Sequence, residues 1–375
     1  MPGRVILLGA TGYTGRLTAE VMTRAGLAPV LAGRSPDALV SLVGDLAGLG
    51  PIDAAPTWRQ ADVNDPASVS ALPAGPQDVL VTTVGPFARL GRPAIAAAVE
   101  HGCGYVDSTG ESSFIRSVFE EHGPRAEQTG ARLLTAFGYD FVPGNLAAGL
   151  ALREARDRGR VPSAVEIGYF VRGGLAISSG TRASAALIAT SPAFAYRSGR
   201  IAGQRRTVAT FDVSGRRLDA MPVSGSEHFA LPRLEPGLRD VGVYLGWAGR
   251  WTRAAHAAGG LLTAGARLPV VGSVLSAGVA RAAGDATGQG PTPDQRAAAT
   301  SVAVARTLDG VGRELSRVRV EGPSPYDLTA ELLAWGAAML LTGRATGSGA
   351  LGPVDAFGLV ALERGCADIG LRRVD

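Results

Sequence analysis

The first third of the chain alternates between short apolar runs and longer segments of helical pattern. Residues 4–9, 29–35 and 78–87 are nearly continuous apolar runs, whereas residues 16–26 and 36–49 have the apolar spacing of helices. Strands that are apolar on both faces and joined by helices predict a parallel sheet covered by helices on both sides. Because such crossovers are right-handed, we predict a doubly wound, Rossmann-type α/β domain.

This rhythm changes after about residue 145. Residues 164–174 have the pattern of a strand, and residues 206–231 that of several strands with turns. Strands and helices that do not alternate predict a mixed α+β second domain. The helical pattern of residues 353–370 predicts a C-terminal helix that returns to the first domain. The predicted domains are residues 1–145, 146–345 and 346–375.

The sequence GATGYTG, residues 9–15, joins the first apolar run to the first helix. Backbone N–H groups at the start of a helix favour a phosphate group. Gly9 would allow the strand to turn, Gly12 would let the backbone approach the phosphate, and Gly15 would let helix and strand pack closely. In this strand–turn–helix context the glycines predict a dinucleotide site. The alternative is an ordinary strand-to-helix turn.

The end of the second predicted strand distinguishes between the two nicotinamide cofactors. A site selective for NAD places a carboxylate there, about 20 residues after the glycines, to accept from the ribose 2′-OH. Arg34 and Ser35 occupy this place, and a guanidinium with a hydroxyl donor suits a 2′-phosphate. NADP (NADPH) is therefore the predicted cofactor. The alternative is that Arg34 stacks on the adenine and tolerates both cofactors.

Two further strand ends carry candidate cofactor contacts. Asp62 and Val63 end the third predicted strand, where they would contact the adenine, unless Asp62 only starts the next turn. The fourth strand ends at Val84, after which Gly85 permits close approach to a ribose and Pro86 stiffens the loop. Ligands bind at the carboxyl ends of parallel strands, near the point where the strand order reverses. A tight turn without a ligand is the alternative for this fourth strand end.

A reductase also needs an acid or an ordered water that protonates the atom left negative by hydride addition. The chain has four histidines and no lysine, so the candidates are few. Tyr139 and Asp140 lie at the predicted domain crossover, with a capping and hinge role as the alternative. His228 lies beside Glu227, which could orient it, and a packed strand histidine is the alternative.

Composition excludes several classes of chemistry. All 37 basic residues are arginine, so a Schiff-base lysine, a Tyr-x-x-x-Lys pair and a phosphate-loop lysine are excluded. The net charge of +4 is carried by scattered arginines without interleaved aromatic residues, which predicts no nucleic-acid partner. Cys103 and Cys366 lie far apart, which predicts buried free thiols and no metal site.

Residues 257–280 form an Ala/Gly-rich apolar segment interrupted by Arg267 and Pro269. A membrane-spanning helix needs about 20 mostly apolar residues without such a break. Two packed helices over a pocket are therefore expected, with a lid that touches a membrane or an apolar substrate as the alternative. The first strand begins near Arg4, which leaves no room for a signal peptide. We expect a cytoplasmic protein, and leave open a peripheral membrane contact and a homodimer.

Together these motifs resemble the saccharopine dehydrogenase-like (saccharopine reductase-like) NADP-binding oxidoreductases, in the branch of the actinobacterial trans-acting enoyl reductases. The resemblance rests on GATGYTG with LAGRS, on VGPFARLG with CGYVDSTGE, and on FGYDFVPGNLA. It implies a Rossmann domain, a mixed α/β substrate domain and a returning C-terminal helix. The cofactor contacts that it implies are Thr11, Gly12, Tyr13, Thr14, Arg34, Asp62, Val84 and Gly85. Many relatives have serine where this chain has Gly144, which removes a hydroxyl near the crossover.

The expected function is hydride transfer from NADPH to an activated C=C bond, enoyl- or enone-like, of an apolar lipid- or polyketide-type molecule. The Ala-, Gly- and Leu-rich second part motivates the apolar substrate, since an amino-acid-like substrate would call for converging basic side chains. Reduction of a C=N (imine) bond is one alternative. A non-catalytic protein that binds or senses NADP is the other.

Overall fold

The computed structural model describes residues 3–51, 54–174, 178, 193–204, 207–247, 249, 252–253 and 290–374. Contacts divide the chain into two compact units. The first unit comprises Met1–Gly110, Phe114–Asp140 and Tyr326–Gly358. The second unit comprises Glu111–Ser113, Phe141–Pro325 and Leu359–Asp375.

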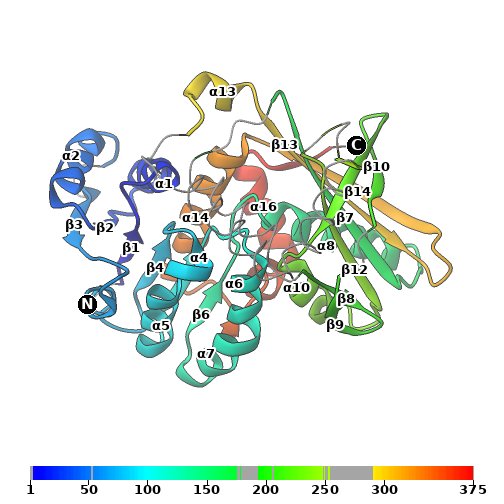
Figure 1. Ribbon diagram of the computed structural model, residues 1–375, viewed down its shortest axis with the longest axis horizontal. Coiled ribbons are helices and arrows are strands. Elements are labelled where there is room, and N and C mark those ends of the chain that lie inside the picture. Colours follow the sequence, from blue (N-terminus) through cyan, green and yellow to red (C-terminus); the bar gives the residue numbers. More distant parts are fainter. Residues whose placement is uncertain are drawn as a thin grey trace, which may run out of the picture. The chain divides into compact units, whose positions relative to one another are not determined.

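The first unit contains a seven-stranded parallel sheet with the order β15-β6-β5-β4-β1-β2-β3 (Figure 1). The strands are β1 Val5–Leu8, β2 Val30–Gly33, β3 Thr57–Gln60, β4 Val79–Thr82, β5 Gly104–Asp107, β6 Arg132–Leu134 and β15 Gly349–Ala350. The strand order reverses at β1, which lies between β4 and β2, as in a doubly wound sheet. Four central strands, β1, β2, β4 and β5, are buried along their whole length, which confirms the predicted cover on both faces.

Helices of the first unit follow these strands in the predicted alternation. They are α1 Tyr13–Arg24, α2 Pro36–Leu46, α3 Pro66–Ser70, α4 Phe87–Leu90, α5 Arg92–His101, α6 Ser112–Ser117, the π-helix η2 Val118–His122, α7 Gly123–Thr129, α14 Pro325–Leu341 and α15 Pro353–Phe357. The α2 helix begins with Pro36 after the capping residue Ser35, a common start signal for a helix.

The segment Tyr326–Gly358 belongs to the first unit through an aromatic cluster. The Phe137 ring lies 6.2 Å from the Trp335 ring, which in turn lies 4.8 Å from the Phe357 ring. The prediction assigned residues up to 345 to the second domain, so it differs from the observed division here. The chain returns to the first sheet as strand β15, which pairs with β6, where the prediction expected a helix that packs on the first domain.

The second unit contains a mixed sheet with the order β10-β11-β12-β7-β13-β14-β16 and a β8-β9 hairpin on β12. The β12–β7 pair is parallel, whereas the other neighbours are antiparallel. The strands are β7 Ala164–Arg172, β8 Phe194–Arg197, β9 Arg200–Gly203, β10 Ala209–Val213, β11 Arg216–Val223, β12 Asp240–Leu245, β13 Thr300–Leu308, β14 Glu314–Gly322 and β16 Arg372–Val374. The helices are α8 Val142–Asp157, α10 Glu227–Leu234, α13 Pro293–Ala297 and α16 Leu359–Asp368.

The last helix and strand belong to this second unit. Arg153 of α8 forms an ion pair with Glu363 of α16 at 3.1 Å, and Glu154 pairs with Arg373 of β16 at 2.5 Å. The segment predicted to return as one helix is therefore divided, since residues up to Gly358 join the first unit and those from Leu359 join the second.

The two cysteines are buried free thiols, as predicted. Within the described part of the chain, no helix is long and apolar enough to cross a membrane. The segment at residues 257–280, predicted as two packed helices or a lid, lies outside the described residues.

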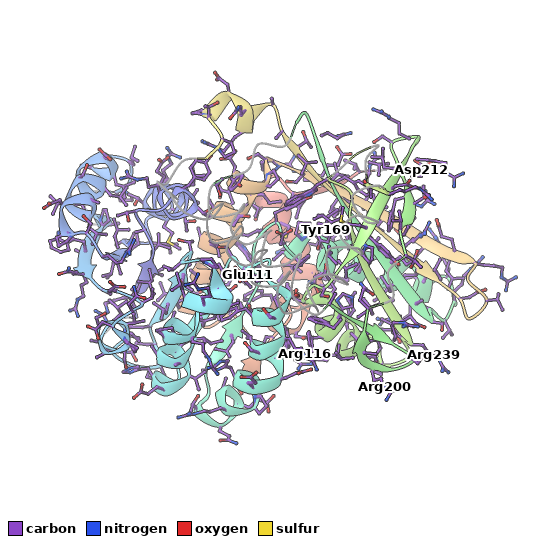
Figure 2. All side chains as sticks on the ribbon, viewed as in Figure 1. Glu111, Arg116, Tyr169, Arg200, Asp212 and Arg239 are labelled. Atoms are coloured by element: carbon purple, nitrogen blue, oxygen red, sulfur yellow. The ribbon has the colours of Figure 1, made fainter. Side chains whose placement is uncertain are left out.

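The start of α8 is held by a buried tyrosine in the second unit. The Tyr169 hydroxyl of β7 accepts a hydrogen bond from Gly144 N–H at 2.8 Å and donates to Glu227 Oε1 at 2.6 Å. Tyr169 and Glu227 are fully buried, and Figure 2 shows Tyr169 inside this unit, with Asp212 and Arg200 toward its outside. A Cβ on Gly144 would lie 2.1 Å from the tyrosine oxygen.

We expect the substitution Gly144→Ala to lower the free energy of unfolding of the second unit by about 1–3 kcal/mol, because the new methyl group overlaps the Tyr169 hydroxyl. Denaturant unfolding measured by circular dichroism checks this. The control is Gly44→Ala in α2, where a Cβ meets nothing within 4 Å and alanine should stabilise the helix by about 0.5–1 kcal/mol. Equal effects of the two substitutions would contradict the prediction.

Candidate functional site

The glycine loop is shaped by close approach to the end of β4. Gly9 has φ +85°, and a Cβ on it would lie 2.7 Å from the Val84 Cγ2 atom. The Thr83 hydroxyl donates to the Gly9 carbonyl oxygen at 3.2 Å, which ties the two strand ends together. A Cβ on Gly15 would lie 2.1 Å from that same carbonyl oxygen, so helix α1 can approach the loop only with glycine there. The roles predicted for Gly9 and Gly15 in turning and packing thus have a steric basis.

The start of α1 fits an anionic ligand. Among the described residues, the helix has no side-chain cap at Gly12 and no acidic residue in its first turn. Helix N-termini without such partners present N–H groups and a positive dipole end to a ligand. The Tyr13 ring packs edge-on against the Tyr326 ring, with 5.2 Å between the ring centroids. This contact holds the first turn of α1 against helix α14. Phosphate contact at Thr11, Gly12, Tyr13 and Thr14 stays a prediction that this arrangement supports.

Arg34 and Ser35 lie at the carboxyl end of β2, where they were expected. Both side chains are exposed, and the Gln60 amide donates to the Arg34 carbonyl oxygen at 3.1 Å, which holds the turn. The Ser35 hydroxyl accepts from Ala38 N–H at 3.4 Å and so caps α2. Its proton can still be donated to a ligand, because a hydroxyl accepts and donates at the same time.

Asp62 and Val63 follow the third strand rather than ending it. The strand β3 ends at Gln60, so the predicted strand end at Val63 is wrong by three residues. Asp62 Oδ1 accepts from the backbone and side-chain N–H groups of Asn64, each at 2.9 Å. Asp62 therefore starts a turn, as the alternative interpretation has it. Its second oxygen is a further acceptor through which the predicted adenine contact could still form.

Val84, Gly85 and Pro86 form the loop between β4 and α4, at the switch point of the sheet. The Val84 side chain packs against Gly9, and Gly85 is exposed. The loop therefore lies beside the glycine loop within the first unit, as a shared ligand site requires.

Tyr139 and Asp140 end the first unit's segment Phe114–Asp140. Tyr139 is buried and its backbone N–H donates to the Thr329 hydroxyl at 3.0 Å. Asp140 is half-buried, and burial raises the pKa of its carboxyl to about 7. A Cβ on Gly110 would lie 3.1 Å from Asp140 Oδ2, so this oxygen rests against the backbone after β5. A carboxyl that titrates near neutral pH is suited to general acid chemistry.

His228 lies in the second unit and not in a strand, since it belongs to helix α10. Its ring is fully buried, Nδ1 is bonded to the Gly225 backbone at 3.0–3.1 Å, and burial lowers its pKa to about 4. Glu227 Oε1 is bonded to Tyr169 and not to His228. The expectation that Glu227 orients this histidine is therefore not met. The ring is neutral at pH 7, which favours the alternative of a packed structural histidine.

Asp107 is a residue that sequence reasoning missed. It ends β5 and is fully buried, and burial raises the pKa of its carboxyl to about 6 against the opposing effect of backbone hydrogen bonds from Ala136 and Thr109. The available signal was an acid at the end of an apolar strand, the same signal that pointed to Asp62.

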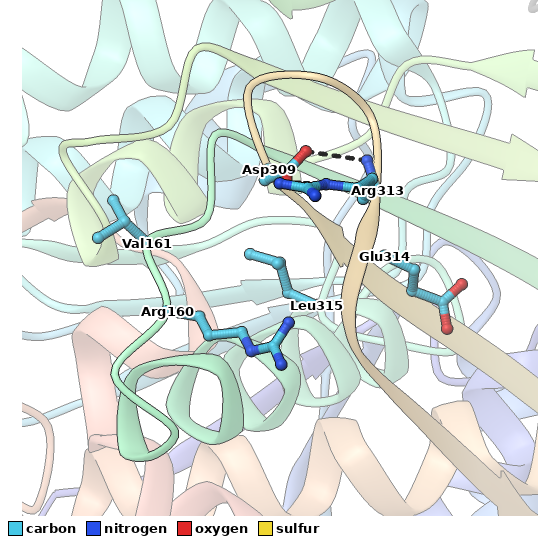
Figure 3. A pocket seen from close by; sticks show the side chains of 6 residues that line it. All are labelled: Arg160, Val161, Asp309, Arg313, Glu314 and Leu315. Carbon is cyan, nitrogen blue, oxygen red and sulfur yellow. Dashed lines mark hydrogen bonds and ion pairs between the residues drawn. The ribbon is translucent and has the colours of Figure 1, made fainter.

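A surface pocket of ≈ 390 Å³ lies elsewhere, in the second unit (Figure 3). It is lined by Arg160, Val161, Asp309, Arg313, Glu314 and Leu315. Arg313 and Asp309 already pair with each other at 2.8 Å across the β13–β14 turn. The pocket contains none of the predicted site residues. Within the described part of the chain, no group of three or more His, Cys, Asp or Glu side chains could hold a metal ion.

Three comparisons with known proteins bear on the chain. No family model matches the chain. The chain is 40% identical over 146 residues to a trans-acting enoyl reductase of Mycobacterium leprae, and 40% identical over 144 residues to one of Mycobacterium tuberculosis. Each match covers 38% of this chain and 34% of the relative, so the chain matches about a third of the length of these proteins.

A solved structure matches over the whole length. Saccharopine dehydrogenase (L-Glu forming) from Saccharomyces cerevisiae superposes with a TM-score of 0.60 at 13% identity, covering 99% of both chains. This likeness shows the fold, with its parallel sheet and its second mixed sheet. The predicted fold class and the predicted resemblance are both confirmed.

Proposed function

We propose that this chain, a relative of mycobacterial trans-acting enoyl reductases with the fold of saccharopine dehydrogenase, is an oxidoreductase that uses NADPH to reduce an activated C=C bond. The observation that carries the proposal is the arrangement of the first unit. An uncapped helix start, an arginine at the end of β2 and a carboxyl with a pKa of about 7 all lie in that unit.

The cofactor half rests on charge and steric fit. The start of α1 offers N–H groups to a diphosphate, and Gly9 and Gly15 let the end of β4 and helix α1 pack closely around the glycine loop. The exposed Arg34 guanidinium suits a 2′-phosphate, because it can donate two parallel hydrogen bonds with a full positive charge. Bound NADPH would supply the hydride.

The acid half rests on Asp140. Addition of hydride to one carbon of an activated C=C bond places negative charge on the other carbon and its activating carbonyl, and a proton must follow. Asp140 in its protonated form can supply that proton and is left as a carboxylate, which takes up a proton from water before the next turnover. Its pKa of about 7 keeps a large fraction of Asp140 protonated at neutral pH. His228 has a pKa of about 4, so its ring has already lost the acidic proton at that pH.

The substrate is proposed as an apolar enoyl or enone compound of lipid or polyketide type. The names of the mycobacterial relatives support the enoyl group. The scarcity of polar residues in the Ala- and Gly-rich segment at residues 257–280 supports the apolar character. A homodimer and a peripheral membrane contact stay predictions.

Product analysis tests the proposed reaction. The protein with NADPH is offered enoyl thioesters, enones and imines, and the product is identified by mass spectrometry and NMR. Enoyl or enone substrates should gain two hydrogens at carbon. Reduction of imines alone would replace the proposal by C=N reduction, and tight NADPH binding without turnover on any substrate would favour a sensing protein.

The variant Arg34→Ala should weaken NADPH binding by about 10- to 100-fold and leave NADH binding nearly unchanged, because only NADPH carries the 2′-phosphate. Isothermal titration calorimetry with both cofactors measures this without any substrate. Arg24→Ala is the matched control, since Arg24 is an exposed arginine at the last turn of α1, paired with Glu20. Equal losses for NADPH and NADH would contradict selection by Arg34.

The variant Asp140→Asn should lower kcat by about 10²-fold or more, since it removes the proton donor. In the wild type, kcat should be high below pH 7 and fall as the pH rises through about 7, where the acid loses its proton. Asp45→Asn, an exposed acid of α2, is the control and should keep the wild-type profile.

Asp140→Asn should also change stability with a definite sign. The folded-state pKa of Asp140 is raised, so its contribution to stability is present at low pH and is lost as the pH rises from about 4 to about 7. The variant should therefore be more stable than the wild type at pH 8 and not at pH 4. A loss of stability at pH 8 would indicate a structural role for the carboxylate.

A further inference from the structure

Asp107 holds two segments of the first unit together. Its Oδ1 atom accepts hydrogen bonds from Thr109 N–H and from Ala136 N–H, each at 2.9 Å. The Asp107 carbonyl oxygen accepts from Phe137 N–H at 2.7 Å. Hydrogen bonds to an ionised acceptor are stronger than those between neutral groups, and burial keeps water from competing. The loop after β5 and the loop after β6 are thus joined through one side chain.

Both of these loops are connected with Asp140: the loop after β5 lies against its carboxyl, and the loop after β6 precedes it along the chain. Thr109 precedes Gly110, whose backbone lies against Asp140 Oδ2, with 3.1 Å from that oxygen to the Cβ position of residue 110. Ala136 lies four residues before Asp140 and has the left-handed φ of 56°, which is unfavourable for alanine. The hydrogen bond that its N–H donates to Asp107 is a contact that holds this backbone turn in place.

We propose that Asp107 is a positioning residue for Asp140, because it holds both the loop at Gly110, against which the Asp140 carboxyl lies, and the turn at Ala136, which leads along the chain to Asp140. The proposal rests on the proposed function for the role of Asp140 as proton donor. It adds a residue that contacts neither substrate nor cofactor and that acts through two backbone segments.

The acceptor atom of Asp107, rather than its charge, is what this role requires. Asparagine keeps an oxygen at the Oδ1 position. Its NH₂ group would take the place of Oδ2, which has no hydrogen-bond partner among the described residues. The Tyr105 and Thr135 hydroxyls, which lower the pKa of the Asp107 carboxyl in the wild type, can accept as well as donate. Leucine has a similar volume and no acceptor, so it leaves two buried N–H groups unsatisfied. Comparison of Asp107→Asn, which loses only the charge, with Asp107→Leu, which loses both the charge and the acceptor, therefore distinguishes the two effects.

The experiment measures the Asp140 carboxyl directly. Protein carrying ¹³C-labelled aspartate is titrated by NMR, with the Asp140 signal assigned by its absence in Asp140→Asn. The Asp140 pKa should stay near 7 in the wild type and in Asp107→Asn. In Asp107→Leu it should fall by one unit or more, because the loosened loops admit water to the carboxyl.

Turnover provides the second measurement. With the substrate found by product analysis, Asp107→Leu should lower kcat by about 10²-fold with little change in the KM for NADPH, since misplacement of an acid by about 1 Å is enough for such a loss. The falling limb of its pH profile should move to lower pH together with the Asp140 pKa. Asp107→Asn should keep most of the wild-type kcat and the wild-type limb.

An Asp140 titration in Asp107→Leu that equals the wild type would overturn the proposal. Equal shifts in Asp107→Asn and Asp107→Leu would also overturn it, because they would assign the effect to charge. If Asp107→Leu does not fold, Gly110→Ala tests the same arrangement with Asp107 intact, since the new Cβ crowds Asp140 Oδ2. A change of half a pKa unit or more in that variant supports the proposal, and an unchanged titration overturns it.

The titration needs no substrate, so it separates this proposal from the proposed function. If no compound is reduced, the role of Asp140 as a proton donor fails, and the NMR measurement still decides whether Asp107 holds its carboxyl. If reduction is found and Asp107→Leu leaves both the Asp140 titration and kcat unchanged, the positioning role alone fails.

Discussion

The close approach of Gly9 to the end of β4 is the constraint on which the first unit's candidate site depends. The Gly9 carbonyl oxygen accepts from Thr83, and the space that its missing side chain leaves is bounded by Val84. Gly15 must in turn be glycine, because its Cβ position overlaps that same carbonyl oxygen. One backbone group therefore sets where α1 begins and where the β4 loop lies. A ligand at the carboxyl edge of the sheet would meet both at once.

Two buried carboxyls hold loop and helix ends in similar ways, one in each unit. In the first, Asp107 Oδ1 accepts two backbone N–H groups from separate loops. In the second, Glu227 accepts from the Tyr169 hydroxyl, which itself accepts from the first turn of α8 at Gly144. A buried acceptor is stabilised by the donors that reach it. Asp107 therefore holds the loop backbone directly, whereas Glu227 holds the first turn of α8 through the Tyr169 hydroxyl.

The sequence contained enough to predict the central strands of the first sheet, because β1, β2, β4 and β5 are buried along their whole length and leave a clear apolar pattern. The exposed strand β3 lacks this pattern, and its end was predicted three residues too late. It also indicated Arg34 correctly as the residue after β2, since that place depends only on local spacing. It could not predict that Tyr326–Gly358 joins the first unit, because the stacking of Phe137 on Trp335 links positions 198 residues apart (335 − 137 = 198). Long-range contact also explains why the suggested pairing of Glu227 with His228 is not seen: the two are adjacent in sequence, whereas Glu227 bonds Tyr169, 58 residues away.

The different surroundings of Asp107 and Asp140 in the first unit suit the two different roles that we propose for them. A carboxyl removed from water must either receive hydrogen-bond donors or take up a proton. Asp107 receives backbone donors that oppose the effect of its burial on the pKa, so it serves as a fixed acceptor. For Asp140, burial is the cause that raises the pKa, to about 7, and none of the described residues provides a donor that opposes it. Asp107 therefore holds the backbone that supplies its donors, whereas the Asp140 carboxyl keeps a proton near neutral pH, which is what the proposed role of proton donor requires.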